Sequence, residues 1–125
     1  MKRIIVDLDN TICKTSDGNY SDAIPVSDMV NKIRSLKKEG YEISIYTSLN
    51  MRTYESNLGK IAANTIPIII DWLRKHEIPC DELFIGKPWC GDDGFYVDDR
   101  AIRPSEFLKY SNSEIMEILA REIAS

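Results

Sequence analysis

Apolar residues along the chain alternate between a spacing of two, typical of strands, and a spacing of three to four, typical of amphipathic helices. The strand-like segments are short and rich in β-branched or aromatic residues, and no repeat, low-complexity stretch or linker interrupts the alternation. This rhythm predicts an α/β fold. The expected strands are Arg3–Asp7, Ile43–Thr47, Leu83–Ile85 and Phe95–Val97, and the expected helices run from about Val26 to Gly40, from Thr65 to Lys75 and from Ser113 to Ile123.

The length of the chain limits the number of domains, and the lengths of its connections limit how the strands can be joined. With 125 residues the chain has room for one domain, which we place at 1–125. The polar segment 14–27 is rich in turn formers and separates the first strand from the first helix. The link 86–94 is shorter than the roughly twelve residues that a parallel crossover usually needs. Either this link runs nearly extended or the strand before it is marginal.

Composition places the chain among globular proteins, with 43% hydrophobic and 29% charged residues. A formal net charge of -4 disfavours neutralising a phosphate backbone, so we expect no nucleic-acid partner, while a small phosphorylated substrate stays compatible. The three cysteines lack CxxC or zinc-ligand spacing, which is typical of reduced thiols. The longest apolar run, Ile66–Leu73, is too short to span a membrane. Because Met-Lys-Arg leads directly into a strand, we expect no signal peptide and a cytoplasmic protein.

The octet Ile4–Thr11, Ile-Ile-Val-Asp-Leu-Asp-Asn-Thr, carries two aspartates where the first strand ends. Residues two apart share a face of a strand, so Asp7 and Asp9 can converge on one point. Such a pair can coordinate a hard cation, divide nucleophilic and acid/base roles, or do both. An Asp/Asn turn after a strand is the alternative interpretation, and the octet alone does not exclude it.

Polar residues also follow the other predicted strands. Thr47 ends the second strand, Lys87 follows the third, and the pair Asp98-Asp99 follows the fourth. In an open parallel sheet, ligands bind beyond the carboxyl ends of the strands. A carboxylate nucleophile, a hydroxyl, an ammonium and an acidic pair suit a phosphoryl group bound beside Mg²⁺, which would also offset the repulsion among the carboxylates.

Taken in order, these residues resemble the motifs of the haloacid dehalogenase (HAD) superfamily of aspartate-nucleophile phosphohydrolases. Each motif is a weak pattern alone, but all of them in the family's order make a specific match over residues 4 to 99. The resemblance implies a Rossmann-like three-layer αβα sandwich with a mainly parallel sheet in the order 4-1-2-3. The matching segments are Asp7-Leu-Asp-Asn-Thr11, Ile43-Ser-Ile-Tyr-Thr47, Lys87 in Gly-Lys-Pro, and Phe95-Tyr-Val-Asp-Asp99.

The resemblance also implies a role for each residue. Asp7 attacks phosphorus and becomes an aspartyl-phosphate, while Asp9 protonates the leaving oxygen and then activates water. Thr47 and Lys87 bind the phosphoryl oxygens and stabilise charge in the transition state. The implied Mg²⁺ ligands are the Asp7 carboxylate, the Asp9 main-chain carbonyl, Asp98, and Asp99 either through water or as an orienting group.

In this family a cap domain usually chooses the substrate, and neither usual insertion point has room for one here. We therefore expect a capless member whose site stays open for a bulky substrate or is covered by another copy in a homo-oligomer. Specificity would then rest on local loops, above all on 48–60, whose charges either bind substrate or face water. The candidate substrate-binding residues are Thr11, Ser48, Asn50 and Arg52.

These inferences predict a Mg²⁺-dependent phosphomonoester hydrolase that acts on a small sugar phosphate or related metabolite. The segments Gly-Lys-Pro-Trp and Asp-Asp-Arg also resemble capless relatives associated with surface-polysaccharide synthesis. One alternative is a phosphoacceptor or regulatory module without turnover. The phosphoacceptor is disfavoured because its acidic pair comes first and its Lys last, the reverse of the order here, and the regulatory module because Asp7 and Asp9 are both present. Another is a nucleotide or polynucleotide phosphatase, and the negative net charge counts against the polymer.

Overall fold

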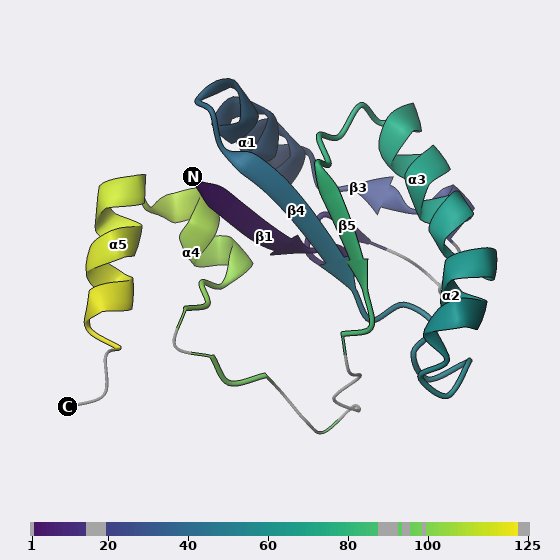
Figure 1. The fold of residues 1–125 in the computed structure, drawn as a ribbon. Helices are drawn as coiled ribbons and strands as arrows, with labels where there is room; N and C mark the ends of the chain where they lie inside the picture. The colour runs from purple at the N-terminus through teal and green to yellow at the C-terminus, as the bar shows by residue number, and fades with distance from the viewer. Residues whose placement is uncertain (1, 15–19, 88–92, 94–95, 99, 123–125) are drawn as a thin grey trace. The chain divides into compact units, whose positions relative to one another are not determined.

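A computed structural model describes residues 2–14, 20–87, 93, 96–98 and 100–122 of the chain (Figure 1). The chain divides into two compact units, Met1–Trp89 and Cys90–Ser125. The first unit combines a parallel sheet with helices, and the second carries helices α4 and α5. The expected α/β class is confirmed, and the described elements are compatible with a Rossmann-like fold. A single domain over 1–125 stays a prediction.

The first unit is built on a parallel sheet whose strands lie in the order β1-β4-β5. The register pairs Ile4 with Ile43 and Ile45 with Leu83, so apolar residues from all three strands lie on one face. The first three predicted strands are therefore confirmed as neighbours in the expected order. They are β1, Arg3–Asp7, β4, Glu42–Thr47, and β5, Glu82–Ile85.

The predicted fourth strand does not form at the positions that the structure describes. Tyr96 and Val97 belong to no strand, and Val97 is 87% exposed, whereas Phe95 lies outside the described residues. Apolar alternation shows that a segment could join a sheet, but pairing also needs a strand edge with free backbone groups. Among the described residues the main sheet holds three strands in the expected order. The fourth strand, which was expected beside β1, is not found among those residues.

Helix α1, Ser27–Lys38, follows the first strand and packs against β4, as its apolar stripe predicts. Its last turn is basic, which suits the negative end of the helix dipole, and Gly40 follows with φ +97°. Arg34 donates to the carbonyls of His76 at 2.7 Å and Glu77 at 3.2 Å, which joins α1 to the end of α3. The buried residues of α1 are Met29, Val30, Ile33 and Leu36.

Helix α3, Ile66–Lys75, confirms the helix predicted over 65–75, with Pro67 in its first turn. Helix α2, Leu58–Asn64, precedes it and was not predicted as a separate helix. Of its short sequence only Ile61 is buried, so it carries no amphipathic stripe that a sequence could reveal. Its N-terminus is capped by the Asn57 side chain, which accepts a hydrogen bond from the Lys60 N–H at 3.1 Å.

The expected polar segment 14–27 contains secondary structure. Strands β2, Cys13–Lys14, and β3, Ile24–Pro25, pair antiparallel, and a 3₁₀ turn, η1, covers Tyr20–Asp22. A backbone hydrogen bond of 2.7 Å from Val26 N to Ile12 O extends this pairing. Strands of two residues are too short to show periodicity, which is why the sequence predicted loop here.

The second unit contains helix α4, Pro104–Lys109, and helix α5, Asn112–Ala120. Helix α5 confirms the helix predicted over 113–123, with ends that differ by one to three residues. It begins with a capping box, in which Ser111 and Glu114 exchange backbone and side-chain hydrogen bonds. Helix α4 was not predicted, because its 6 residues are too few for a recognisable stripe.

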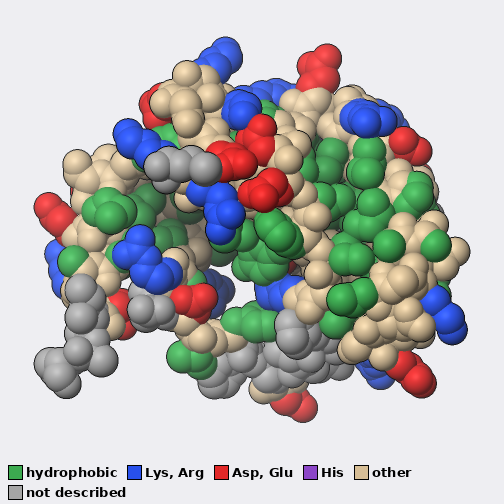
Figure 2. Space-filling model, viewed as in Figure 1, with side chains coloured by type: hydrophobic (Ala, Val, Ile, Leu, Met, Phe, Trp, Pro, Cys, Tyr) green, Lys and Arg blue, Asp and Glu red, His purple; other side chains and the backbone are tan. Residues whose placement is uncertain are grey.

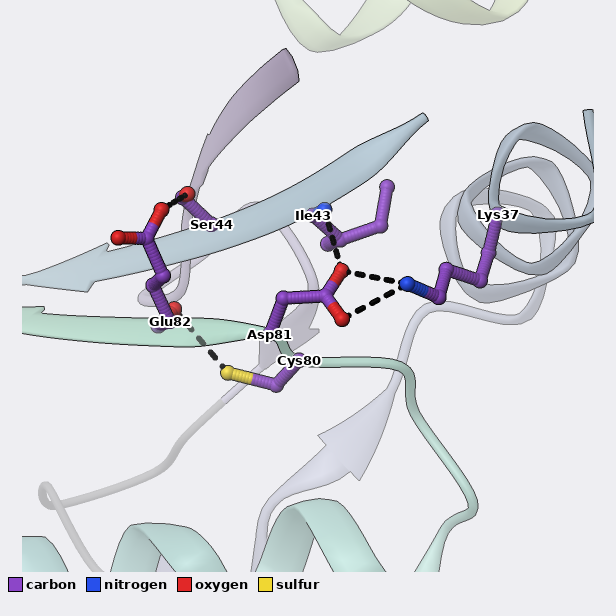
Figure 3. Close-up of polar contacts among 6 residues, drawn as sticks. All are labelled: Lys37, Ile43, Ser44, Cys80, Asp81 and Glu82. Carbon is purple, nitrogen blue, oxygen red and sulfur yellow. Dashed lines mark hydrogen bonds and ion pairs between the residues drawn. The ribbon is translucent and has the colours of Figure 1, made fainter. Parts of the chain in front are cut away.

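Polar contacts set the register between β4 and β5 (Figure 3). Asp81, just before β5, accepts a hydrogen bond from Ile43 N at 2.8 Å, and its two carboxylate oxygens lie 2.7 and 2.8 Å from Lys37 Nζ. On the opposite face, Ser44 and Glu82 form a side-chain hydrogen bond of 2.7 Å. These contacts tie the start of β5 to α1 and to the middle strand.

Hydrophobic side chains remain on the surface of the first unit. Ile24 is 69% exposed and Ile68 of α3 is 47% exposed. Figure 2 shows hydrophobic side chains gathered on the face that carries α3. Exposed apolar side chains are common on the surfaces of globular proteins. Within the described ranges no helix has the length and apolar character needed to cross a bilayer.

Candidate active site

The parallel strands β1, β4 and β5 end at the same edge of the sheet, and each brings a predicted site residue there (Figure 1). Asp7 is the last residue of β1 and Thr47 the last residue of β4. Lys87 follows β5 after one intervening glycine, Gly86. Parallel pairing alone places these residues together, because register aligns the ends of neighbouring strands.

Asp7 is held by two side chains. Its Oδ1 lies 3.3 Å from Lys87 Nζ, and its Oδ2 accepts a hydrogen bond of 3.1 Å from Thr11 Oγ1. The ion pair is partly shielded from water, since the Asp7 and Lys87 side chains are 22% and 17% exposed. The carboxylate is therefore oriented from both sides while part of it still reaches solvent.

The chain turns sharply after β1 and so returns Thr11 to Asp7. Asn10 adopts φ +58°, a left-handed conformation that Asn tolerates better than most residues, and Ile12 N donates to Leu8 O at 3.0 Å. The Asp/Asn turn that was the alternative interpretation of the octet is thus present. It is also what arranges the carboxylates, so the two interpretations are compatible.

Asp9 lies against the end of the neighbouring strand. Its Oδ2 accepts a hydrogen bond of 2.7 Å from Thr47 Oγ1, and Thr47 Oγ1 in turn accepts from Leu49 N at 2.9 Å. Thr47 is completely buried. The hydroxyl hydrogen of Thr47 is thus directed at Asp9, and the backbone after β4 holds the hydroxyl in that orientation.

The pKa of Asp9 is raised above its usual value, mainly because burial penalises the charged carboxylate. The hydrogen bond from Thr47 opposes this rise, the nearby charge of Asp7 adds to it, and Lys87 opposes it again. A carboxyl group with a raised pKa can carry a proton more readily than an ordinary aspartate. Asp9 therefore has the character of a general acid and base beside an oriented carboxylate.

The charge of Asp7 acts on Asp9, and such a pair of carboxylates fits a divalent cation, since hard cations prefer oxygen ligands and would relieve the repulsion. Within the described residues, however, no group of three or more His, Cys, Asp or Glu is placed to hold a metal. Asp98 belongs to the second unit, is exposed, and accepts from Arg100 N at 2.7 Å. Asp99 lies outside the described residues. The predicted ligand set stays a prediction.

Of the predicted substrate-binding residues, Thr11 is at the site through its bond to Asp7. Asn50 lies in the turns after β4, with φ +61°, and its Oδ1 accepts a bond of 2.6 Å from the buried Thr65 hydroxyl. Ser48 is half-buried next to Thr47, and Arg52 is exposed. The loop after Thr47 is thus anchored through Asn50, and its binding role stays a prediction.

Two free thiols of the first unit are poorly suited to nucleophilic chemistry. Cys13 is buried, and burial raises the pKa of its thiol to about 12, with the charge of Asp9 adding to the effect. The pKa of Cys80 is also raised, again mainly by burial. Both are free cysteines, as their spacing predicts.

Sequence reasoning missed one residue at this edge. Tyr46 pairs with Asp7 across β1 and β4, and the Lys87 ammonium lies over its ring, 4.7 Å from the ring centroid. A signal was available, because Tyr46 immediately precedes Thr47 at the end of a predicted strand. The register of the two strands was needed to show that Tyr46 shares a sheet face with its partner Asp7.

Comparison with known proteins places the fold. No protein-family model matches the chain, and no curated protein does. The crystal structure of an MCSG target from Vibrio cholerae is similar, with 51% sequence identity and a TM-score of 0.91. The match covers 98% of this chain and 99% of that one. The two chains belong to one family. The likeness supports the α/β fold described above and carries no statement of activity.

Proposed function

We propose that this protein is a Mg²⁺-dependent phosphomonoester hydrolase of the HAD type that acts through an aspartyl-phosphate. The observation that carries the proposal is that two carboxylates lie at one edge of the sheet in different environments. Asp7 is oriented by Lys87 and Thr11, whereas Asp9 is partly buried against Thr47 and has a raised pKa. Two carboxyl groups in such different environments are suited to divided roles.

In the proposed reaction the Asp7 carboxylate attacks phosphorus, and the bond to the leaving oxygen breaks. Asp9 donates its proton to that oxygen, then removes a proton from the water that hydrolyses the aspartyl-phosphate. Lys87 binds the phosphoryl oxygens beside Asp7 and reduces the repulsion between two anions. Thr47 orients Asp9 through its hydroxyl, and for Thr47 to bind a phosphoryl oxygen as the resemblance implies, that hydroxyl would have to turn from Asp9 to the substrate.

Mg²⁺ fits the proposal because the charge of Asp7 raises the pKa of Asp9, and a bound cation would offset that repulsion. The Asp7 carboxylate and the Asp9 main-chain carbonyl would hold the ion. Asp98, which belongs to the other unit, and Asp99, which lies outside the described residues, are further ligands only by the family resemblance. When bound, it supplies positive charge that stabilises the negative phosphoryl group. Every proton transfer in the proposal is assigned to Asp9.

The proposed substrate is a small phosphorylated metabolite, and sugar phosphates are the first class to test. We further propose a capless cytoplasmic enzyme whose site is left open or is covered by another copy of the chain. The pattern of strand-end residues supports the reaction, and the loop 48–57 anchored by Asn50 and Thr65 supports local substrate selection.

The test is a phosphate-release assay over a panel of phosphomonoesters, with and without Mg²⁺. We expect Mg²⁺-dependent turnover that Asp7→Asn abolishes and that Asp9→Asn reduces by about 10²–10⁴-fold. Asp71→Asn, at an exposed carboxylate on α3, is the matched control and should keep full activity. Full activity in Asp7→Asn would overturn the nucleophile assignment. Phosphorylation of Asp7 without turnover of any substrate would instead identify a phosphoacceptor module.

A further inference from the structure

The ring of Tyr46 lies under the Lys87 ammonium at the edge of the sheet that carries Asp7. It is the residue before Thr47 on β4 and the register partner of Asp7 on β1. Paired residues of parallel strands point to the same face, so the Tyr46 ring and the Asp7 carboxylate share one face of the sheet. Lys87, which follows the end of β5, lies against the same face.

Lys87 Nζ contacts two groups of different kinds at this face. It lies 3.3 Å from Asp7 Oδ1 and 4.7 Å from the centroid of the Tyr46 ring. The second distance is within the range in which an ammonium is attracted to the negative face of an aromatic ring. The ammonium is therefore attracted both by an anion and by a ring.

A lysine needs such a support here. Its side chain has four flexible methylene groups and loses much rotamer freedom when it is fixed in one place. Lys87 also follows Gly86, whose φ of +103° marks a turn at the end of β5. Phosphoryl transfer depends on positioning of positive charge, so a mobile ammonium would cost rate even if it stayed in the site.

We propose that Tyr46 is a positioning residue that holds the Lys87 ammonium beside Asp7 by a cation–π contact. The proposal rests on the proposed phosphatase function, because it concerns how Lys87 serves that reaction. The aromatic face is what matters. Within the described residues of the chain the Tyr46 hydroxyl makes no hydrogen bond, so phenylalanine should replace tyrosine with little loss.

The competing explanation is that Tyr46 only fills space on the sheet. Phe84 of β5 pairs with Tyr46 in register, lies on the same face and is 46% exposed. It offers a matched control, because Phe84→Leu removes an aromatic ring from the same face one strand away. If packing were the whole role, Tyr46→Leu and Phe84→Leu would have similar effects.

The first experiment detects the contact without any substrate. Lysine labelled with ¹³C at Cε is incorporated into the full chain, and the Lys87 signal is assigned by its loss in Lys87→Ala. A lysine over an aromatic face has its ε protons shifted upfield. We expect that shift in wild type and in Tyr46→Phe, its loss in Tyr46→Leu, and its retention in Phe84→Leu. An unshifted signal in wild type would overturn the contact.

The second experiment measures kcat and KM with the best substrate of the phosphate-release panel. Tyr46→Leu should lower kcat/KM by about 2- to 30-fold, mostly through kcat, because a mobile ammonium still attracts the substrate but is less often aligned. Tyr46→Phe should keep the kcat/KM of the wild type, because phenylalanine retains the aromatic face. In a Lys87→Ala background, Tyr46→Leu should cost nothing further, since residues that act as a unit are not additive.

The outcomes separate the two proposals. An equal loss from Tyr46→Leu with or without Lys87 would overturn the positioning role and leave the phosphatase proposal standing. An upfield Lys87 signal in a protein that hydrolyses no phosphomonoester would overturn the phosphatase proposal while the contact itself stands. Loss of activity in Tyr46→Phe equal to that in Tyr46→Leu would overturn the role of the aromatic face.

Discussion

The Thr47 hydroxyl donates a hydrogen bond of 2.7 Å to Asp9 Oδ2, so the end of β4 holds a carboxylate that follows β1. Thr47 is completely buried, and Leu49 N donates to the same hydroxyl oxygen at 2.9 Å. This bond lowers the pKa of Asp9 while burial raises it, and burial is the larger effect. The proton affinity of Asp9 thus depends on a residue of another strand.

Replacing Thr47 by valine should raise the pKa of Asp9 further, because the opposing hydrogen bond is lost. It should also lower the free energy of unfolding by about 1–3 kcal/mol, since Asp9 and Leu49 N lose a buried partner. Carboxyl ¹³C NMR titration and urea denaturation measure the two effects. Thr47→Ser keeps the hydroxyl and is the control. An unchanged Asp9 pKa in Thr47→Val would contradict the role of this bond.

Replacing Asp9 by asparagine should sharply reduce turnover and yet stabilise the fold at pH 7 in Mg²⁺-free buffer. A carboxyl group whose pKa is raised on folding favours the folded state at pH below its unfolded value, near 3.8, and this contribution is lost as pH rises through the folded value. The gain in urea midpoint should therefore be present at pH 7 and vanish below the unfolded pKa. A lower midpoint at pH 7 would show that Asp9 is not penalised by burial.

Gly86 and Gly40 form a matched pair for testing the turn before Lys87. Both have positive φ, +103° and +97°, so alanine at either should cost about 1 kcal/mol in backbone strain. A Cβ at Gly86 would also lie 3.0 Å from Leu58 Cδ2, whereas a Cβ at Gly40 meets nothing within 4 Å.

We expect Gly86→Ala to be the less stable variant in urea denaturation and, through Lys87, the less active one. Leu58→Ala in the Gly86→Ala background should restore some of the stability by removing the contact, but not the share that comes from φ. Equal stability and activity of Gly86→Ala and Gly40→Ala would contradict the importance of this contact.

Asp81 should contribute stability that depends on pH. Its pKa is lowered, first by the Ile43 N–H and then by Lys37, so its contribution is present above the unfolded pKa, near 3.8, and is lost as pH falls through the folded value. Asp81→Asn should cost about 0.2–1 kcal/mol at pH 7, typical of a partly exposed ion pair, and should cost nothing once Asp81 is protonated.

Lys37→Met removes the same ion pair from the other side and should produce a similar loss at pH 7. Asp71→Asn, at an exposed carboxylate of α3, is the control and should leave the urea midpoint unchanged. The measurement is urea denaturation from about pH 2 to neutral pH, which spans the titration of Asp81. A loss in Asp81→Asn that persists at the lowest pH would assign the effect to packing rather than to charge.

By itself, the sequence determined the local elements that bear the site. Short apolar runs of β-branched or aromatic residues predicted where β1, β4 and β5 end, and the apolar stripes of α1 and α3 predicted the crossovers between them. Such patterns can be recognised because burial of a periodic face depends on residues close in sequence. Short elements such as α2 and β2 escaped prediction, since one or two buried residues make no period. The alternation at Val97 predicted a strand that the described residues do not form.

Only the tertiary structure decided which side chains meet. Asp9 reaches Thr47, Lys87 reaches Asp7, and the Tyr46 ring lies under Lys87, although no local pattern relates these positions. Their meeting depends on strand register, which the contacts of Asp81 help to set, and on the turn at Asn10. The raised pKa of Asp9 has the same origin, because burial is a property of the packed chain and not of the residue.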